Sequence, residues 1–171
     1  TTVLALLVLL GCCTVAAAAT PAESASAELR AMALAVQPAQ IGLTREAFGK
    51  DVWGVVMETG TDAGYYTLVV LGDGSTSLYL STGGGVIGAG EHEAVRVAGA
   101  GLIAEANKHV AAAATSDGFP PPADGDTTFH LLTFDGPRSR TAPTNALGED
   151  KDALSPLFHA AHEVIMQVRL A

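Results

Sequence analysis

Three short runs of β-favouring residues follow one another in the first half of the chain, and they constrain the fold more than any other feature. The runs span residues 51–58, 65–71 and 75–81. Gly72-Asp73-Gly74 separates the second run from the third. Such an Asp-Gly step tolerates the positive φ angles of a tight hairpin. The sequence therefore predicts a three-stranded antiparallel meander.

Helical patterns and a second hairpin surround this meander. Apolar residues at helical spacing predict helices over 28–36, 91–114 and 155–170. Alternation over 127–134, followed by a short run at 139–142, predicts two more strands. The order of elements contains no strand-helix-strand crossover of the kind that builds a parallel sheet. We expect a single α+β domain with an antiparallel sheet of about five strands, flanked by helices.

An apolar leader precedes the domain. Its strongly apolar part ends near Leu10. That length suits the roughly 7–15 apolar residues of a signal-peptide core better than the about 20 residues of a membrane span. The small and polar composition of 21–27 is typical of a tether. We expect a leader at 1–20, a tether at 21–27 and one domain at 28–171.

Three interpretations of the leader remain open. Leu9-Leu10-Gly11-Cys12 resembles a bacterial lipobox with Cys12 as the lipidated residue, whereas Ala17-Ala18-Ala19 suits ordinary signal cleavage. Both predict a protein that is exported or membrane-anchored. Because the segment shows neither an initiator Met nor a basic n-region, translation begun too far upstream is the third interpretation. The domain would then be cytoplasmic.

The charge of the chain argues against two classes of partner. The chain contains eighteen Asp and Glu but nine Lys and Arg, which gives a formal net charge of −9. Nucleic-acid binding draws its affinity mainly from phosphate neutralisation, so we expect no nucleic-acid partner. Anionic membrane surfaces are disfavoured for the same reason, and we expect membrane attachment through the leader alone. Both cysteines lie in the leader, so the domain has no thiolate metal site.

A glycine-rich segment after the third run is the first candidate ligand site. Residues 83–88 fit the G-x-G-x-x-G pattern between a predicted strand and a predicted helix. However, Glu91 and Glu93 would repel a pyrophosphate at the start of that helix, and the meander offers no parallel strand with a ribose-binding acid. A backbone connection that needs conformational freedom is the simpler interpretation. A small ligand at this place would contact Ser81, Thr82, Gly83, Gly84, Gly85 and Gly88, beside the polar strand face of Ser77, Tyr79 and Ser81.

Histidines on the last predicted helix are the second candidate. His159 and His162 stand at i, i+3 spacing and Glu163 follows, so the two imidazoles can share a metal such as zinc. His92 could add a ligand if the glycine loop approached this helix. Helical projection instead places His162 at the margin of the apolar face and His159 away from it. Ordinary surface histidines are the simpler interpretation, and no cofactor is predicted.

Two segments resemble a group of small uncharacterised bacterial single-domain proteins. They are Ser77–Gly88 (SLYLSTGGGVIG) and Leu154–Ile165 (LSPLFHAAHEVI). The resemblance extends over about 28–169 and implies no activity. The order of elements also resembles the profilin-like and roadblock/longin-like folds, which implies a central five-stranded sheet flanked by helices.

These observations favour a non-enzymatic binding or scaffold domain that meets a protein or small ligand through a sheet face or a helix pair. Self-association through an edge strand would make it a homo-oligomer. The alternative is a metal-dependent or small-molecule enzyme that uses His92, His159 and His162 near the Gly83–Gly90 loop.

Overall fold

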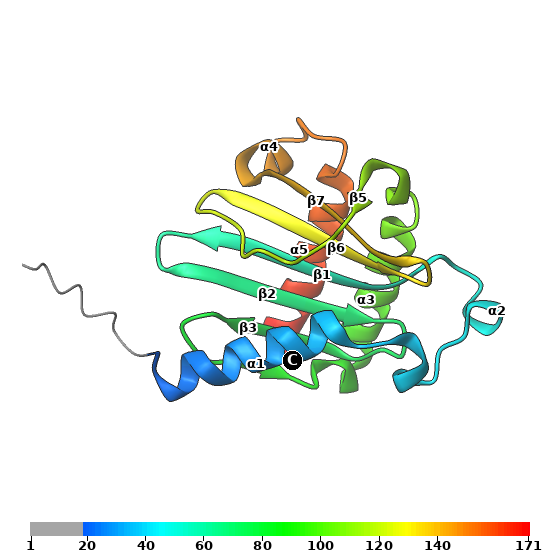
Figure 1. Ribbon diagram of the computed structural model, residues 1–171, viewed down its shortest axis with the longest axis horizontal. Coiled ribbons are helices and arrows are strands. Elements are labelled where there is room, and N and C mark those ends of the chain that lie inside the picture. The colour runs from blue at the N-terminus through cyan, green and yellow to red at the C-terminus, as the bar shows by residue number, and fades with distance from the viewer. Residues whose placement is uncertain (1–18) are drawn as a thin grey trace, which may run out of the picture.

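A computed structural model describes residues 19–171 as one seven-stranded antiparallel sheet with helices on both faces (Figure 1). Residues 1–18, which include Cys12 and most of the predicted leader, lie outside the described residues. The strands are β1 Val52–Thr61, β2 Gly64–Leu71, β3 Thr76–Leu80, β4 Gly85–Ile87, β5 Ala114–Thr115, β6 Asp126–Thr133 and β7 Gly136–Pro143. The α-helices are α1 Pro21–Ala35, α2 Arg45–Phe48, α3 Glu93–Ala106, α4 Thr144–Gly148 and α5 Ser155–Leu170. None of the helices within 19–171 has the length and apolarity that crossing a membrane requires.

The strand order is β4-β3-β2-β1-β6-β7-β5, so β1 lies at the centre. The predicted meander corresponds to β1, β2 and β3, and the predicted second hairpin to β6 and β7. The α+β class and the antiparallel sheet are confirmed, but the sheet has seven strands rather than about five. The two extra strands, β4 and β5, are three and two residues long and form the two edges. Such short strands show no alternation that a sequence pattern can reveal.

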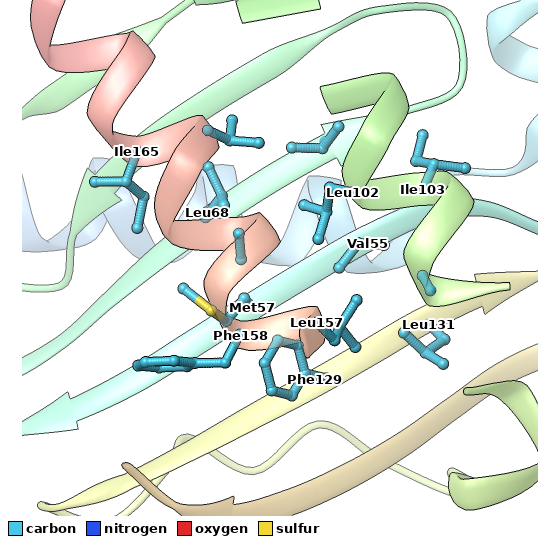
Figure 2. Packing of buried hydrophobic residues seen from close by; sticks show 14 of the residues in the cluster. Val55, Met57, Leu68, Leu102, Ile103, Phe129, Leu131, Leu157, Phe158 and Ile165 are labelled. Carbon is cyan, nitrogen blue, oxygen red and sulfur yellow. The ribbon is translucent and has the colours of Figure 1, made fainter. Parts of the chain in front are cut away.

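The main core lies between the sheet and the pair α3 and α5. Figure 2 shows α5 and α3 lying across β1 and β6, with their apolar side chains directed at the sheet. The predicted apolar face of α5 is confirmed, because each of its members is at most 5% exposed: Leu157, Ala161, Val164, Ile165 and Val168. A sheet face that is covered by two helices in this way loses its contact with water.

A second, smaller apolar cluster lies on the opposite face beneath α1, which crosses in front of β2 and β3 in Figure 1. Strict alternation from the sequence would put Trp53 on the same face as Val55. The structure instead has a register shift between Val52 and Gly54. This irregularity turns Trp53 toward α1 while Val55 stays in the main core.

The predicted tether at 21–27 is wrong, because these residues form the first two turns of α1. Thr20 and Glu23 form a capping box, and Pro21 occupies the start of the helix. These features satisfy backbone donors that would otherwise be unpaired. The local capping signals therefore outweigh the small, polar composition that suggested a tether.

The helix predicted over 91–114 ends early, at Ala106. The side chain of Asn107 accepts hydrogen bonds from the backbone amides of Asp51 and Val52 and donates to the carbonyl oxygens of Val52 and Ile103. These four bonds tie the end of α3 to the start of β1. Since Asn competes well for backbone groups at helix ends, the following alanines do not prolong the helix.

Two glycines within α3 make a matched test of this packing. Gly99 lies against the sheet, where an added Cβ would stand 3.0 Å from Val70 Cγ1, whereas a Cβ on Gly101 would meet open space. We predict that Gly101→Ala raises the free energy of unfolding by about 1 kcal/mol through helix propensity. Gly99→Leu should lower it by about 1–3 kcal/mol through overpacking. Urea unfolding followed by Trp53 fluorescence measures the free energy of unfolding of both variants. Equal changes in the two variants would contradict the placement of Gly99 against the sheet and Gly101 in open space.

Candidate functional site

The glycine-rich segment forms the hairpin between β3 and β4. Its glycines adopt positive φ angles, with values of 101° at Gly83, 86° at Gly84 and 149° at Gly85. A Cβ on Gly85 would stand 2.4 Å from the carbonyl oxygen of Leu78. Only glycine fits such a close approach at this backbone conformation. The motif therefore serves the path of the backbone and lets β4 pair with β3.

The other residues predicted to hold a ligand have different surroundings. Ser81 Oγ accepts a hydrogen bond from the Tyr65 amide at 2.9 Å, and Thr82 is exposed. Gly88 lines a cleft of about 430 Å³ that also contains the carboxylates of Asp73 and Glu91. Those charges make the cleft unsuitable for a phosphate. The structure thus brings the six residues together as one hairpin and its exit.

The outer edge of β4 pairs with no strand within residues 19–171, because β4 ends the sheet. All three of its residues are exposed. In an antiparallel strand, alternate backbone N–H and C=O groups point away from the neighbour. Among the described residues, β4 therefore presents backbone donors and acceptors without a strand partner at the edge of the sheet.

An apolar groove of about 380 Å³ lies between α5 and the helix-covered face of β2 and β3, the two strands next to β4 in the sheet. Its lining consists of Tyr66, Leu78, Leu80, His162, Ile165, Met166 and Arg169. Leu80 and Met166 are each 47% exposed. Val86 of β4 is 44% exposed and pairs with Leu78, which places it on the same face. An apolar surface thus continues from the groove onto the open edge. We call the outer edge of β4 and this groove together the edge groove.

The two histidines of α5 have separate surroundings. His159 is exposed, and its Nε2 lies 2.9 Å from Asp150 Oδ1. His162 packs against the Phe158 ring at 4.2 Å and lines the edge groove. Its Nε2 is buried and makes no hydrogen bond to the described residues. Burial, with added repulsion from His159 and Arg169, lowers the pKa of His162, so its ring is uncharged at neutral pH.

The predicted metal ligands do not form a recognisable centre. Within residues 19–171, no group of three or more His, Cys, Asp or Glu side chains is arranged to hold a metal ion. His92 precedes α3 at an exposed position, and Glu163 is exposed on α5, where it accepts a hydrogen bond from Gln167. The His92, His159, His162 and Glu163 hypothesis therefore receives no geometric support from the described residues.

A cluster of polar side chains surrounds Glu58 beneath α1, and its residues were not among the sites predicted from the sequence. Glu58 is completely buried on the central strand β1. Two N–H groups of the Arg30 guanidinium on α1 donate to its carboxylate, Nε to Oε1 at 2.6 Å and Nη2 to Oε2 at 2.7 Å. Thr67 Oγ1 donates to Oε1 at 2.9 Å, and His130 Nε2 lies 3.3 Å from Oε2. Glu58 stands out in the sequence as the one carboxylate within an apolar run, which is the signal that could have identified it.

Ionised Glu58 sets the hydrogen-bonding roles around it. Burial alone would raise the pKa of Glu58, but the hydrogen bonds from His130 and Arg30 outweigh it and lower the pKa. The ionised carboxylate can only accept, so His130 Nε2 carries the proton that points to it. On the other side of the ring, His130 Nδ1 lies 2.6 Å from Ser139 Oγ. The series Ser139, His130 and Glu58 resembles the nucleophile, base and acid of a catalytic triad. However, Arg30 already neutralises Glu58, the acid that would have to stabilise an imidazolium. The cluster is better suited to holding a cation than to base catalysis.

Comparison with known proteins gives no further guide. No family model, no curated protein and no solved structure matched the chain.

We predict that Glu58→Gln lowers the free energy of unfolding by about 3 kcal/mol, because it leaves the largely buried Arg30 without its counter-charge. Arg30→Met with Glu58→Gln should cost less than the sum of the two single changes, since neither charge then remains. Urea unfolding of the four proteins in this double-mutant cycle measures the coupling. Additive effects would show that the ion pair contributes nothing to stability.

Acid should weaken the same interaction. Because the pKa of Glu58 is lower in the folded protein than its ordinary value of 4.5, the ion pair stabilises the fold above that value. This stabilisation is lost as the pH falls through the folded-state pKa. We predict that the difference in unfolding free energy between the wild type and Glu58→Gln is constant from pH 7 to about 5 and shrinks below about 4.5. A difference that stays constant down to pH 3 would contradict the ionised state of Glu58.

Proposed function

We propose that this protein is a non-enzymatic binding module that takes up an extended segment of a partner protein in the edge groove. The observation that carries this proposal is the open edge of β4 next to an apolar groove. An added strand can pair with the outer backbone groups of β4, and its side chains on the α5 side can pack on Val86, toward the groove.

The chemistry of the groove indicates what the partner segment contains. Leu80, Val86 and Met166 offer half-exposed apolar surface. A flexible Met side chain adapts to apolar groups of different shapes. His162 adds an uncharged imidazole to the lining of the groove. We therefore expect an extended segment in which apolar residues alternate with polar ones.

Selection from a random peptide library on the immobilised protein tests this function. We predict that the enriched peptides show alternating apolar residues and bind the wild type. Leu80→Lys with Met166→Lys should weaken their binding at least about tenfold, which corresponds to a loss of about 1.4 kcal/mol. Binding is measured by fluorescence anisotropy of the labelled peptides.

Val97→Lys is the matched control, because Val97 is 66% exposed on α3 and lies outside the groove lining. This variant should bind the peptides as the wild type does. A library that yields no enriched peptide, or peptides that bind all variants equally, would contradict the proposal. Sedimentation of the wild type and the Leu80→Lys, Met166→Lys variant tests whether a second copy of the chain occupies the edge groove instead.

A further inference from the structure

The pocket that holds the Arg30 side chain has the features of a guanidinium-binding site. The carboxylate of Glu58 accepts two hydrogen bonds from the guanidinium, and the carbonyl oxygen of Phe119 accepts a third from Nη2 at 2.8 Å. The ring of Tyr65 lies 5.6 Å from the guanidinium carbon. A planar cation with several donors satisfies all these contacts at once, whereas an ammonium group cannot bind the carboxylate in this two-pronged way. We call Glu58, Thr67, Tyr65 and the Phe119 carbonyl the guanidinium cradle.

The side chains of the cradle come from the sheet rather than from α1, and only the Phe119 carbonyl comes from the segment between β5 and β6. Glu58 pairs with Thr67 across β1 and β2, and Thr67 pairs with Tyr79 across β2 and β3, so these residues form one row on the sheet face. Thr67 and His130 hold the carboxylate in place. Removal of Arg30 would therefore leave an oriented, buried carboxylate.

The packing of α1 on this face leaves two buried polar groups without hydrogen-bond partners among the described residues. The hydroxyl of Tyr79 and the indole N–H of Trp53 are both buried, and neither makes a hydrogen bond to the described residues. The two residues are 4% and 3% exposed. An unpaired buried polar group costs roughly 1–3 kcal/mol, so α1 leaves hydrogen-bonding capacity unused on the surface it covers. Tyr79 lies in the same row as Glu58, and burial together with the charge of Glu58 raises the pKa of the Tyr79 hydroxyl.

α1 also buries little of itself. Ser26 and Leu34 are the buried residues among its 15. Much of its attachment therefore depends on Arg30 and on a short apolar contact around Leu34. A helix with so few buried residues is expected to detach locally at a lower free energy than the core elements.

We propose that the guanidinium cradle is a binding site for an arginine side chain of another molecule, and that Arg30 fills this site from within the chain until α1 is displaced. The net charge of −9 favours the approach of a cationic partner. The incoming group replaces the contacts of Arg30, and its neighbouring atoms can pair with the Tyr79 hydroxyl. This site lies on the sheet face opposite the edge groove, so the inference does not depend on the proposed function.

Chemical rescue tests the site in the full chain. Arg30→Ala removes the internal occupant, and ethylguanidinium chloride is then added at millimolar concentrations. We predict that ethylguanidinium raises the Tm of Arg30→Ala by roughly 2–4 °C in a saturable way, because it binds the folded state alone. Ethylammonium chloride at equal concentration controls for ionic strength and should have a much smaller effect. The wild type, whose cradle is filled, should shift little.

Arg30→Ala with Glu58→Gln is the control for the location of binding, and it should lose the rescue. If ethylguanidinium and ethylammonium act equally, or if both variants respond equally, the proposal is overturned. If Arg30→Ala is unfolded, the same titration remains decisive. Ethylguanidinium should then restore the fluorescence of buried Trp53, and a failure to restore it at saturating concentration overturns the proposal.

Discussion

A carboxylate in the middle of the central strand is the constraint on which much of this structure depends. Glu58 lies on β1 and is completely buried. An unpaired charge at such a place would be very costly, so its surroundings must supply donors. Arg30, Thr67 and His130 do so from three different elements. One buried charge thereby fixes the position of α1 on the sheet and orients neighbouring side chains.

The two faces of the sheet consequently differ in character. The face under α3 and α5 is apolar and closely packed, as Figure 2 shows. The face under α1 combines a small apolar cluster with the row of Glu58, Thr67 and Tyr79. The edge groove adds a third kind of surface, where the sheet ends before its backbone groups are paired. The sheet therefore presents two surfaces with different chemistry, and we propose that one binds an extended apolar strand and the other a guanidinium cation.

Patterns that extend over several turns or strands were predictable from the sequence. The meander, the second hairpin and the apolar face of α5 follow from alternation and helical spacing. The missed features depend on contacts between distant residues. Asn107 ends α3 through bonds to β1, and the register shift near Gly54 redirects Trp53. The short edge strands depend on their neighbours for pairing and carry no periodic signal of their own.

The candidate sites show the same division. The sequence drew attention to the glycine-rich segment, and this segment does form the open edge, although its glycines serve the backbone rather than a phosphate. It also drew attention to His162, which lines the edge groove without a metal partner among the described residues. Arg30 and Glu58 are 28 residues apart, and no local pattern connects them. Their pairing becomes visible when α1 is placed on the sheet.

Hydrogen–deuterium exchange with a bound library-selected peptide locates the peptide on the fold and so reports on binding in the edge groove. We expect slower exchange in the β3–β4 hairpin, where new backbone hydrogen bonds would form, and in the second half of α5 beside the groove. Exchange at β5 and β7, on the opposite edge, should not change. Protection confined to that opposite edge, or protection of neither edge, would contradict the proposed binding mode.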